Sequence, residues 1–241
     1  MARTDRICLF TGVSGRLGRE FSIRHANDYT IVGVYHRREP VLPVSELASP
    51  EPPAGGIFGI RLDLGAEGAA DELGRMVLER FGSCDLVVNA AVFTHLGPAT
   101  SEAMLETLDW QFYLNVSVPV RVVAAIVEGG WRHTAEENRE RGRNVVNLSS
   151  TAGHVVYPGS GRAGYSATKA ALDMWTLYAA SELAPLGVRA NVIAPDAFPA
   201  RVPTESVTEA IVRYDGGTQT GDLLVIDEQG ERTMPSRLEG A

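Results

Sequence analysis

The chain of 241 residues is poor in cysteine, with only Cys8 and Cys84. Two cysteines are too few for a disulfide-stapled secreted fold or a cysteine-rich zinc cluster. Both lie in or beside apolar runs, which predicts packed, reduced thiols in a cytoplasmic protein. The five histidines show no metal-ligand spacing, so we predict no metal site and interpret His95 and His154 as ordinary loop residues.

Basic residues are also outnumbered, 22 against 30 acidic ones, for a net charge of −8. This balance disfavours nucleic acid or an anionic membrane as the main partner, since either would need a basic face. Long hydrophobic runs are missing near the start: the polar first residues precede an apolar run of only residues 7–10. That run is too short for a signal sequence or a membrane span.

What is present fits an ordinary globular protein, with 44% hydrophobic and 22% charged residues. Short apolar runs alternate with segments of helical spacing, which predicts a Rossmann-type, doubly wound, seven-stranded parallel sheet with helices on both faces. We expect residues 1–241 to form one domain. The predicted strands are residues 7–10, 29–35, 57–64, 85–89, 144–148, 188–194 and 222–227. The predicted helices are residues 17–27, 69–81, 101–127, 163–183 and, shorter, 206–214.

Two segments interrupt this alternation. Residues 40–56 contain five prolines, which predicts a surface connection. Residues 131–143 are densely charged, which favours a solvated excursion between a helix and a strand, with a partner-docking arm as the alternative.

A glycine-spaced loop follows the first predicted strand, with Gly12, Gly15 and Gly18 at its turns. Such glycines let the backbone approach a diphosphate, and the helix behind offers free N–H groups and the positive end of its dipole. An ordinary strand–helix turn is the alternative, but the strand before and the helix after favour a dinucleotide site.

The end of the second strand bears on which dinucleotide binds. An acidic residue there typically holds the ribose of NAD, but this strand ends in His36, Arg37 and Arg38. Together with Arg16, these guanidinium groups are suited to a 2′-phosphate, which predicts NADP, with NAD the less favoured cofactor. The alternative is that Arg37 and Arg38 are solvated loop charges.

Tyr165 and Lys169 stand four residues apart, on one face of the long predicted helix. A neighbouring ammonium favours the phenolate, so this pair is suited to exchanging a proton with a carbinol or carbonyl oxygen. Upstream, Ser149 and Ser150 end the fifth strand at the carboxyl edge of the sheet, where open α/β sheets bind ligands. A serine there can donate a hydrogen bond to a substrate oxygen, and one of the two is expected to serve only as a turn residue.

With these residues in place, the chain resembles the short-chain dehydrogenase/reductase family over nearly its whole length. The matching residues are the glycine loop 11–18, Asp63, Asn89, Ala90, Ala91, Asn115, Ser150, Tyr165, Lys169 and the segment 191–195.

The resemblance implies a role for each catalytic position. Tyr165 would be the acid in reduction or the base in oxidation, and Lys169 would lower its pKa and hold the nicotinamide ribose. Ser150 would orient the substrate oxygen, and Asn115 would hold a water in the proton relay. The implied cofactor-binding residues are Gly12, Ser14, Gly15, Arg16, Leu17, Gly18, His36, Arg37, Arg38, Asp63, Leu64, Asn89, Ala90, Ala91, Tyr165, Lys169 and Pro195.

The chain departs from the family pattern in several places. Its glycines stand at the first, fourth and seventh loop positions rather than the first, fifth and seventh, and Val92 stands where a glycine is usual. Asp196 replaces the glycine after Pro195, either as a substrate contact or as a turn residue. The substrate loop, residues 197–221, is shortened, which predicts an open pocket, a bulky substrate or a lid from a neighbouring subunit.

The expected function is therefore an NADPH-dependent ketoreductase that acts on a small-molecule carbonyl or alcohol. The resemblance also implies a homodimer or homotetramer, assembled through the helices before and after the fifth strand. Two alternatives stay open: a non-redox epimerase or lyase that uses the bound cofactor, and a cofactor-binding sensor without turnover.

Overall fold

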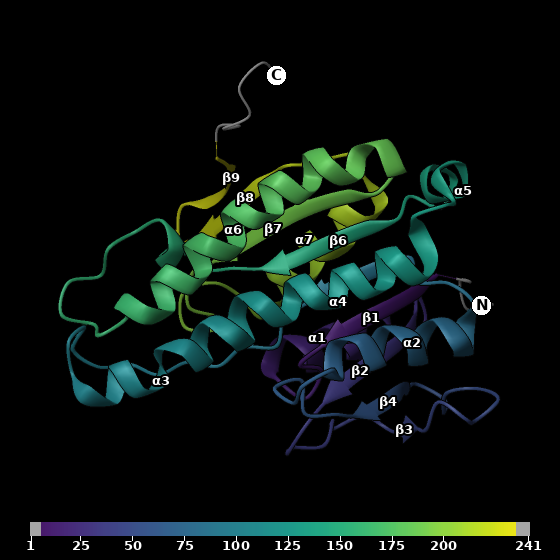
Figure 1. Cartoon of the computed structure of the whole chain (residues 1–241), viewed down its shortest axis with the longest axis horizontal. Coiled ribbons are helices and arrows are strands. Elements are labelled where there is room, and N and C mark those ends of the chain that lie inside the picture. The colour runs from purple at the N-terminus through teal and green to yellow at the C-terminus, as the bar shows by residue number, and fades with distance from the viewer. Residues whose placement is uncertain (1–5, 235–241) are drawn as a thin grey trace.

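The computed structural model describes residues 6–234. Its strands form one sheet in the order β3-β4-β2-β1-β5-β6-β7-β8-β9 (Figure 1). All neighbouring strands are parallel except β8 and β9, which form an antiparallel pair. The strands are β1(Ile7–Thr11), β2(Thr30–Tyr35), β3(Val44–Ser45), β4(Ile57–Arg61), β5(Leu86–Asn89), β6(Asn144–Leu148), β7(Arg189–Pro195), β8(Leu223–Asp227) and β9(Gly230–Thr233).

Helices cover the sheet in two layers. The first layer holds α2, α4 and α6, which lie side by side in front of the sheet, and α1 and α7 pack together behind it (Figure 1). The α-helices are α1(Arg16–His25), α2(Ala69–Phe81), α3(Glu102–Phe112), α4(Val118–Ile126), α5(Ala135–Glu140), α6(Ala163–Leu183) and α7(Thr204–Gly216). The doubly wound parallel sheet expected from the sequence is thereby confirmed.

The structure adds two edge strands to the seven that were predicted. The two-residue strand β3 lies within the proline-rich segment 40–56, and β9 folds back on β8 after a tight turn. Both are short or exposed, so they lack the buried apolar run by which the other strands are recognised.

Residues 102–131 form one continuous helical run: the π-helical turn Tyr113–Ser117 joins α3 to α4, and a second one, Val127–Trp131, ends the run. The run is long and apolar enough to cross a membrane by length and composition alone. Its inner side packs against α2 and the sheet, where Ile126 and Trp131 are buried. A core helix of a globular fold has the same character.

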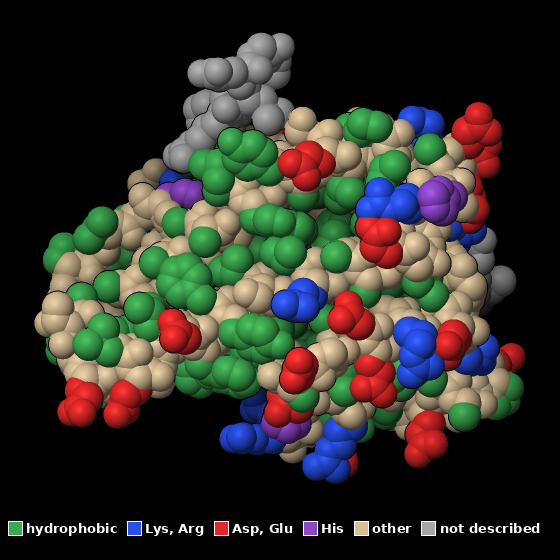
Figure 2. All heavy atoms as spheres, viewed as in Figure 1, with side chains coloured by type: hydrophobic (Ala, Val, Ile, Leu, Met, Phe, Trp, Pro, Cys, Tyr) green, Lys and Arg blue, Asp and Glu red, His purple; other side chains and the backbone are tan. Residues whose placement is uncertain are grey.

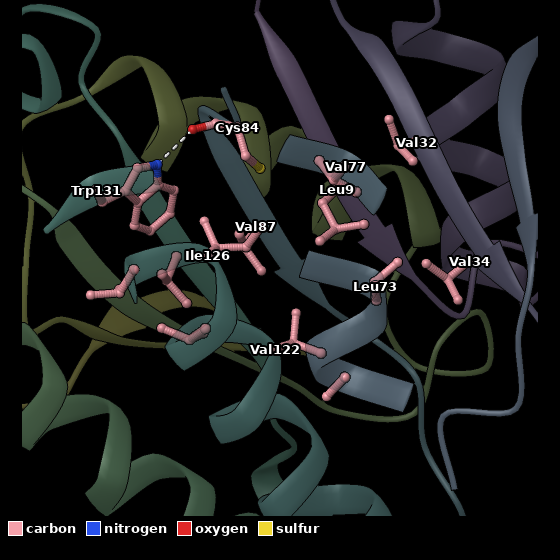
Figure 3. Close-up of a cluster of buried hydrophobic side chains, with 14 of the residues drawn as sticks. Leu9, Val32, Val34, Leu73, Val77, Cys84, Val87, Val122, Ile126 and Trp131 are labelled. Atoms are coloured by element: carbon pink, nitrogen blue, oxygen red, sulfur yellow. Dashed lines mark hydrogen bonds between the residues drawn. The ribbon is translucent and has the colours of Figure 1, made fainter. Parts of the chain in front are cut away.

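The core in front of the sheet is closed by Trp131, whose indole N–H donates to the Cys84 carbonyl at 2.8 Å (Figure 3). The prediction of a solvated excursion over residues 131–143 was therefore wrong at its ends. Trp131 and Arg143 are both buried, and the exposed charges between them are on Arg132 and on α5. The buried Arg143 guanidinium is paired with Glu137, which is why a charged residue is tolerated there.

Helix α7 takes up most of the shortened loop 197–221, so few of its residues remain at the carboxyl edge of the sheet. It begins at Thr204, packs against α1 and buries Val207 and Ile211, so it belongs to the rear layer of the core. Only residues 196–203 then connect β7 to α7 at the carboxyl edge, and within them Asp196 and Val202 are buried.

Candidate active site

A cleft of about 480 Å³ lies at the carboxyl edge of the sheet, beyond the ends of β1, β2, β4 and β5. Its walls contain most of the residues predicted to hold a dinucleotide. The lining residues are Gly12, Ser14, Gly15, Val34, Tyr35, His36, Arg37, Arg38, Leu62, Asp63, Leu64, Ala90, Ala91, Val92, Phe93, Trp110 and Leu114.

The glycine loop is shaped by two close backbone approaches. Gly12 has a positive φ of 77°, and a Cβ there would lie 2.9 Å from the Ala91 backbone. A Cβ at Gly18 would lie 2.4 Å from the Val13 Cα, so only glycine lets α1 pack against the loop. Gly15 begins α1 as its N-cap without a side chain, which leaves the first backbone N–H groups of the helix uncapped by a side chain.

Three residues predicted for this loop do not line the cleft: Gly18, which packs against Val13, and Arg16 and Leu17. The Leu17 side chain is buried in the core behind the sheet, where it contributes packing. Arg16 is exposed on the first turn of α1 and does not line the cleft. Of the three arginines expected to converge, the structure therefore brings Arg37 and Arg38 to the rim and leaves Arg16 outside it.

The basic rim carries unpaired charge. Arg37 and Arg38 are exposed, and neither forms an ion pair or side-chain hydrogen bond with any group in the described part of the chain. His36 Nε2 lies 3.7 Å from the Asp63 carboxylate, whose other oxygen accepts a hydrogen bond from the Gly65 N–H. An anion would find two available guanidinium groups here.

Trp110 is a lining residue that the sequence reasoning missed. A Cβ at Gly65 would lie 2.3 Å from its indole, so the glycine after Leu64 makes room for the ring. Trp110 also stacks on Tyr113 with centroids 5.7 Å apart. The available signal was a large aromatic residue on the helix before Asn115, but nothing local places it against a loop 45 residues earlier.

The floor of the cleft is fixed by hydrogen bonds after β5. The Thr11 hydroxyl accepts from the N–H groups of Ala90 and Ala91, at 3.1 and 3.2 Å. Asn89 donates to the Asn147 side chain at 2.9 Å, while its own Oδ1 is buried without a partner in the described residues. These bonds hold the loop after β5 against β1 and β6.

Tyr165 and Lys169 lie on α6 beside the end of β6. The Lys169 Nζ lies 5.8 Å from the Tyr165 ring centroid and donates a 2.7 Å hydrogen bond to the Leu148 carbonyl. The two side chains predicted to work together are therefore neighbours. Lys169 is the only lysine in the chain and is buried.

Burial dominates the electrostatics of this pair. It raises the pKa of the Tyr165 phenol above its ordinary 10.0, while the Ser150 hydroxyl and then the Arg162 guanidinium act in the opposite direction. Burial also lowers the pKa of Lys169 from 10.5 to about 8, against the opposing charge of Asp173. Lys169, which the resemblance implies would lower the Tyr165 pKa, is not among the groups that shift it in this arrangement.

Asn115 lies in the first π-helical turn and connects two parts of the site. Its side-chain oxygen accepts from the Phe93 N–H, and its side-chain nitrogen donates to the Phe93 carbonyl, each at 2.8 Å. The same nitrogen also donates to the Thr168 hydroxyl at 3.1 Å. Phe93 lines the cleft, and Thr168 precedes Lys169 on α6. Asn115 is the buried residue of this π-helical turn, a feature that is frequent at functional sites.

Ser149, Ser150 and Asp196 complete this edge. The Ser150 hydroxyl accepts from the Ala152 N–H at 3.2 Å, whereas the buried Ser149 hydroxyl has no partner in the described residues. Pro195 is the buried last residue of β7. Asp196 accepts from its neighbour's N–H at 2.7 Å and pairs with Arg201 at 3.1 Å, which supports a turn role over a substrate contact.

His154, interpreted above as an ordinary loop residue, has a specific partner. Its Nε2 lies 2.9 Å from Oδ2 of Asp173, one helical turn beyond Lys169. Neither residue carries a recognisable motif, and 19 positions separate them, so the pair emerges only from the fold.

A family model described as short chain dehydrogenase matches residues 6–209 of the chain. The chain belongs to this family. An uncharacterized oxidoreductase of Mycobacterium bovis is 36% identical over 164 residues, which is 63% of this chain and 61% of the length of that protein. The NADPH carbonyl reductase 2 of Sus scrofa is 32% identical over 190 residues, 78% of this chain and 69% of its own.

Solved structures of short-chain dehydrogenases are similar to this chain as well. A short-chain dehydrogenase from Streptomyces avermitilis superposes with a TM-score of 0.65 at 31% identity, covering 82% of this chain and 68% of the other. The fold and the family are therefore shown, and the substrate has to be argued from the site itself.

Proposed function

We propose that this protein is an NADP-dependent oxidoreductase that interconverts a carbonyl and an alcohol, with reduction as the favoured direction. The observation that carries the proposal is the bridge made by Asn115, which joins the wall of the dinucleotide cleft to α6 beside Tyr165 and Lys169. A cofactor in the cleft and a proton donor on α6 are thereby held in one arrangement.

The residues present fit a nicotinamide dinucleotide. Gly12 and Gly18 stand where any side chain would collide with backbone, and the Asn89 Oδ1 is buried without a partner in the described residues. Gly12, Ser14 and Gly15 would hold the diphosphate, and Asp63 and Leu64 the adenine. Asn89, Ala90 and Ala91 would border the adenosine ribose, and Lys169 and Pro195 the nicotinamide side. When bound, the nicotinamide supplies the hydride.

The chain's own residues would control the proton and the substrate. Because burial raises its pKa, the Tyr165 phenol remains protonated near neutral pH and suits the donation of a proton to a carbonyl oxygen. The Ser150 hydroxyl, at the end of β6, would orient that oxygen. This acid role supports reduction over oxidation.

The choice of NADP over NAD rests on Arg37 and Arg38. Both line the cleft, and both lack partners among the described residues. A bidentate guanidinium matches a 2′-phosphate. The name of the porcine relative, an NADPH carbonyl reductase, is in line with this choice and with a carbonyl substrate.

The test is the absorbance of NADPH in the presence of a panel of ketones and aldehydes. We expect net consumption of NADPH, its loss in Tyr165→Phe, and unchanged NADPH binding in that variant. Tyr214→Phe is the control, because Tyr214 lies on α7 in the rear layer of the core, away from α6 and from the face proposed for the subunit interface. Full activity in Tyr165→Phe would contradict the proton role, and product without net NADPH change would favour an epimerase or lyase.

We also propose that the protein works in the cytoplasm as a homodimer or homotetramer. Hydrophobic side chains spread over the face formed by α3, α4 and α6 (Figure 2), and Trp110, Met174 and Tyr178 are among the exposed ones. A second copy would remove this face from water. The two cysteines are free and buried, in line with a reducing compartment. Light scattering of the purified chain measures the assembly directly.

A further inference from the structure

A buried histidine–carboxylate pair lies next to the lysine of the site. His154 follows the short helical turn Thr151–Gly153, and its Nε2 lies 2.9 Å from Asp173 Oδ2. The side chains are 13% and 4% exposed. No hydrogen bond from any described group reaches the Asp173 carboxylate, and the His154 Nε2 at 2.9 Å is the polar atom that lies against it.

Asp173 has an obvious competing partner. Lys169 stands four residues earlier on α6, the spacing at which an ammonium and a carboxylate commonly meet on a helix. Yet the Lys169 Nζ donates its hydrogen bond to the Leu148 carbonyl, and the side chain that lies against the Asp173 carboxylate in the described chain is the His154 imidazole. Both charges are buried, so the absence of a direct pair needs a physical cause.

Gly153 lets the turn before His154 pack closely against α6, which brings the His154 side chain to the Asp173 carboxylate. A Cβ at Gly153 would lie 2.8 Å from Asp173 Oδ2 and 3.1 Å from the Ala170 backbone nitrogen. Only a glycine lets the turn approach α6 closely enough for the next residue to reach the carboxylate.

We propose that His154 is a positioning residue: it holds the Asp173 carboxylate away from Lys169, so that the ammonium stays directed at the end of β6. This inference rests on the proposed function, in which that ammonium binds the nicotinamide ribose. A Lys169 drawn toward Asp173 would turn away from the sheet edge where the cofactor is expected.

The electrostatics support this reading. At its present position the Asp173 charge already opposes the effect of burial on the Lys169 pKa, and it raises the pKa of Tyr165. A carboxylate in direct contact with the ammonium would raise the Lys169 pKa further. Other titratable or charged groups near the pair are Tyr157 and Arg162 before α6, Asp196 and Arg201 after β7, and Asp227, Glu228 and Arg232 around β8 and β9.

The effect of removing His154 follows from this arrangement. In His154→Ala the carboxylate loses its compensation, and Lys169 becomes the nearest cation able to replace it. In His154→Gln an amide N–H can still bind the carboxylate, so the ammonium should keep its place. In His154→Ala/Asp173→Asn the attracting charge is absent, so the defect should be relieved.

Because Lys169 is the only lysine, its titration can be observed alone. In protein labelled with ¹³Cε-lysine, the single side-chain resonance reports the Lys169 pKa without any cofactor. We expect a value near 8 in the unaltered protein and a rise of roughly one unit or more in His154→Ala. The value should stay near 8 in His154→Gln and lie at or below 8 in the double variant.

His25→Ala is the matched control. His25 Nδ1 also lies 2.9 Å from a carboxylate, that of Asp28, and its side chain is 14% exposed, but the pair lies at the end of α1. Its removal should leave the Lys169 pKa unchanged. If His154→Ala does not fold, His154→Ser takes its place, because a serine is too short to reach the carboxylate: the Lys169 pKa should again rise, and an unchanged value overturns the inference.

NADPH binding, measured by calorimetry, supplies the second readout. We expect a weakening of roughly tenfold in His154→Ala that is recovered in the double variant. An unmoved Lys169 pKa in folded His154→Ala overturns the inference. If the pKa shifts appear as expected but the unaltered protein binds no NADPH, His154 still positions Asp173, and it is the proposed function that fails.

Discussion

The Lys169 ammonium donates a 2.7 Å hydrogen bond to the backbone carbonyl of Leu148. This contact ties the middle of α6 to the last residue of β6, and it places the single lysine charge of the chain at the carboxyl edge of the sheet. The charge is held in a buried position, which has consequences for stability as well as for the site.

The buried lysine predicts a pH-dependent stability. Its pKa is about 8 in the folded chain and near 10.5 when solvated, so between these values the unfolded chain holds the extra proton. The free energy of unfolding contributed by Lys169 therefore rises with pH across that window, and the full cost of burying the charge is present below pH 8. In Lys169→Met we expect a gain of roughly 2 kcal/mol at pH 7, fading toward pH 10.

Urea unfolding at pH 7, 8, 9 and 10 measures this difference between the two proteins. Other groups titrate in the same range, but they are shared by both and cancel in the difference. A stability difference that does not change with pH would show that the charge of Lys169 is not the source.

The basic rim predicts cofactor discrimination. Replacing Arg37 and Arg38 together by alanine should weaken NADPH binding by roughly tenfold or more, because charge-assisted hydrogen bonds to the 2′-phosphate are lost. NADH binding should change little. Arg75→Ala on α2 is the control, since Arg75 pairs with Glu79 far from the cleft. Equal losses for both cofactors in the double variant would contradict the assignment.

The tight packing of the glycine loop predicts a sharp response at Gly18. A Cβ there would meet the Val13 backbone at 2.4 Å, so Gly18→Ala must displace the loop from α1. We expect a loss of stability of about 1–3 kcal/mol and weaker cofactor binding. Gly216→Ala, at the end of α7, has no atom within 4 Å of its new Cβ and should be neutral or slightly stabilising. Thermal unfolding of the two variants makes the comparison.

The buried Asp215 carboxylate, at the opposite edge of the sheet, is expected to contribute strongly to the stability of the fold. Asp215 accepts from the Arg6 guanidinium at 2.6 and 3.0 Å and from the Tyr29 hydroxyl at 2.8 Å. Asp215→Asn should cost about 3 kcal/mol, because a partly buried guanidinium loses its counter-charge. Glu79→Gln, in an exposed pair with Arg75, should cost less than about 1 kcal/mol. Similar losses in chemical denaturation would contradict the importance of burial.

Much of the fold could be read from local patterns. The strands β1, β5 and β6 are mainly apolar and almost fully buried, and α2 and α6 occupy the residues predicted for them. These elements are predictable because burial on both faces of a parallel strand, or on one face of a helix, leaves a periodic record within a few neighbouring residues.

The missed features lack such a record. Trp131 stands at the start of a charged segment, and its burial depends on the Cys84 carbonyl, which lies 47 residues earlier. The helix α7 was expected as a short element of the substrate loop, but its contact with α1 makes it part of the core. In both cases, the partner is distant along the chain.

By itself, the sequence determined which chemical groups are available and in what order they arrive: a glycine loop, a basic strand end, a serine pair, and a phenol and an amine one helical turn apart. The tertiary structure decided which partner each charged group takes. Lys169 binds Leu148 rather than Asp173, and Asp173 meets His154, because a close turn at Gly153 competes with helical spacing. The reason is physical: inside the protein a charge has few possible partners, and only packing determines which of them is within reach.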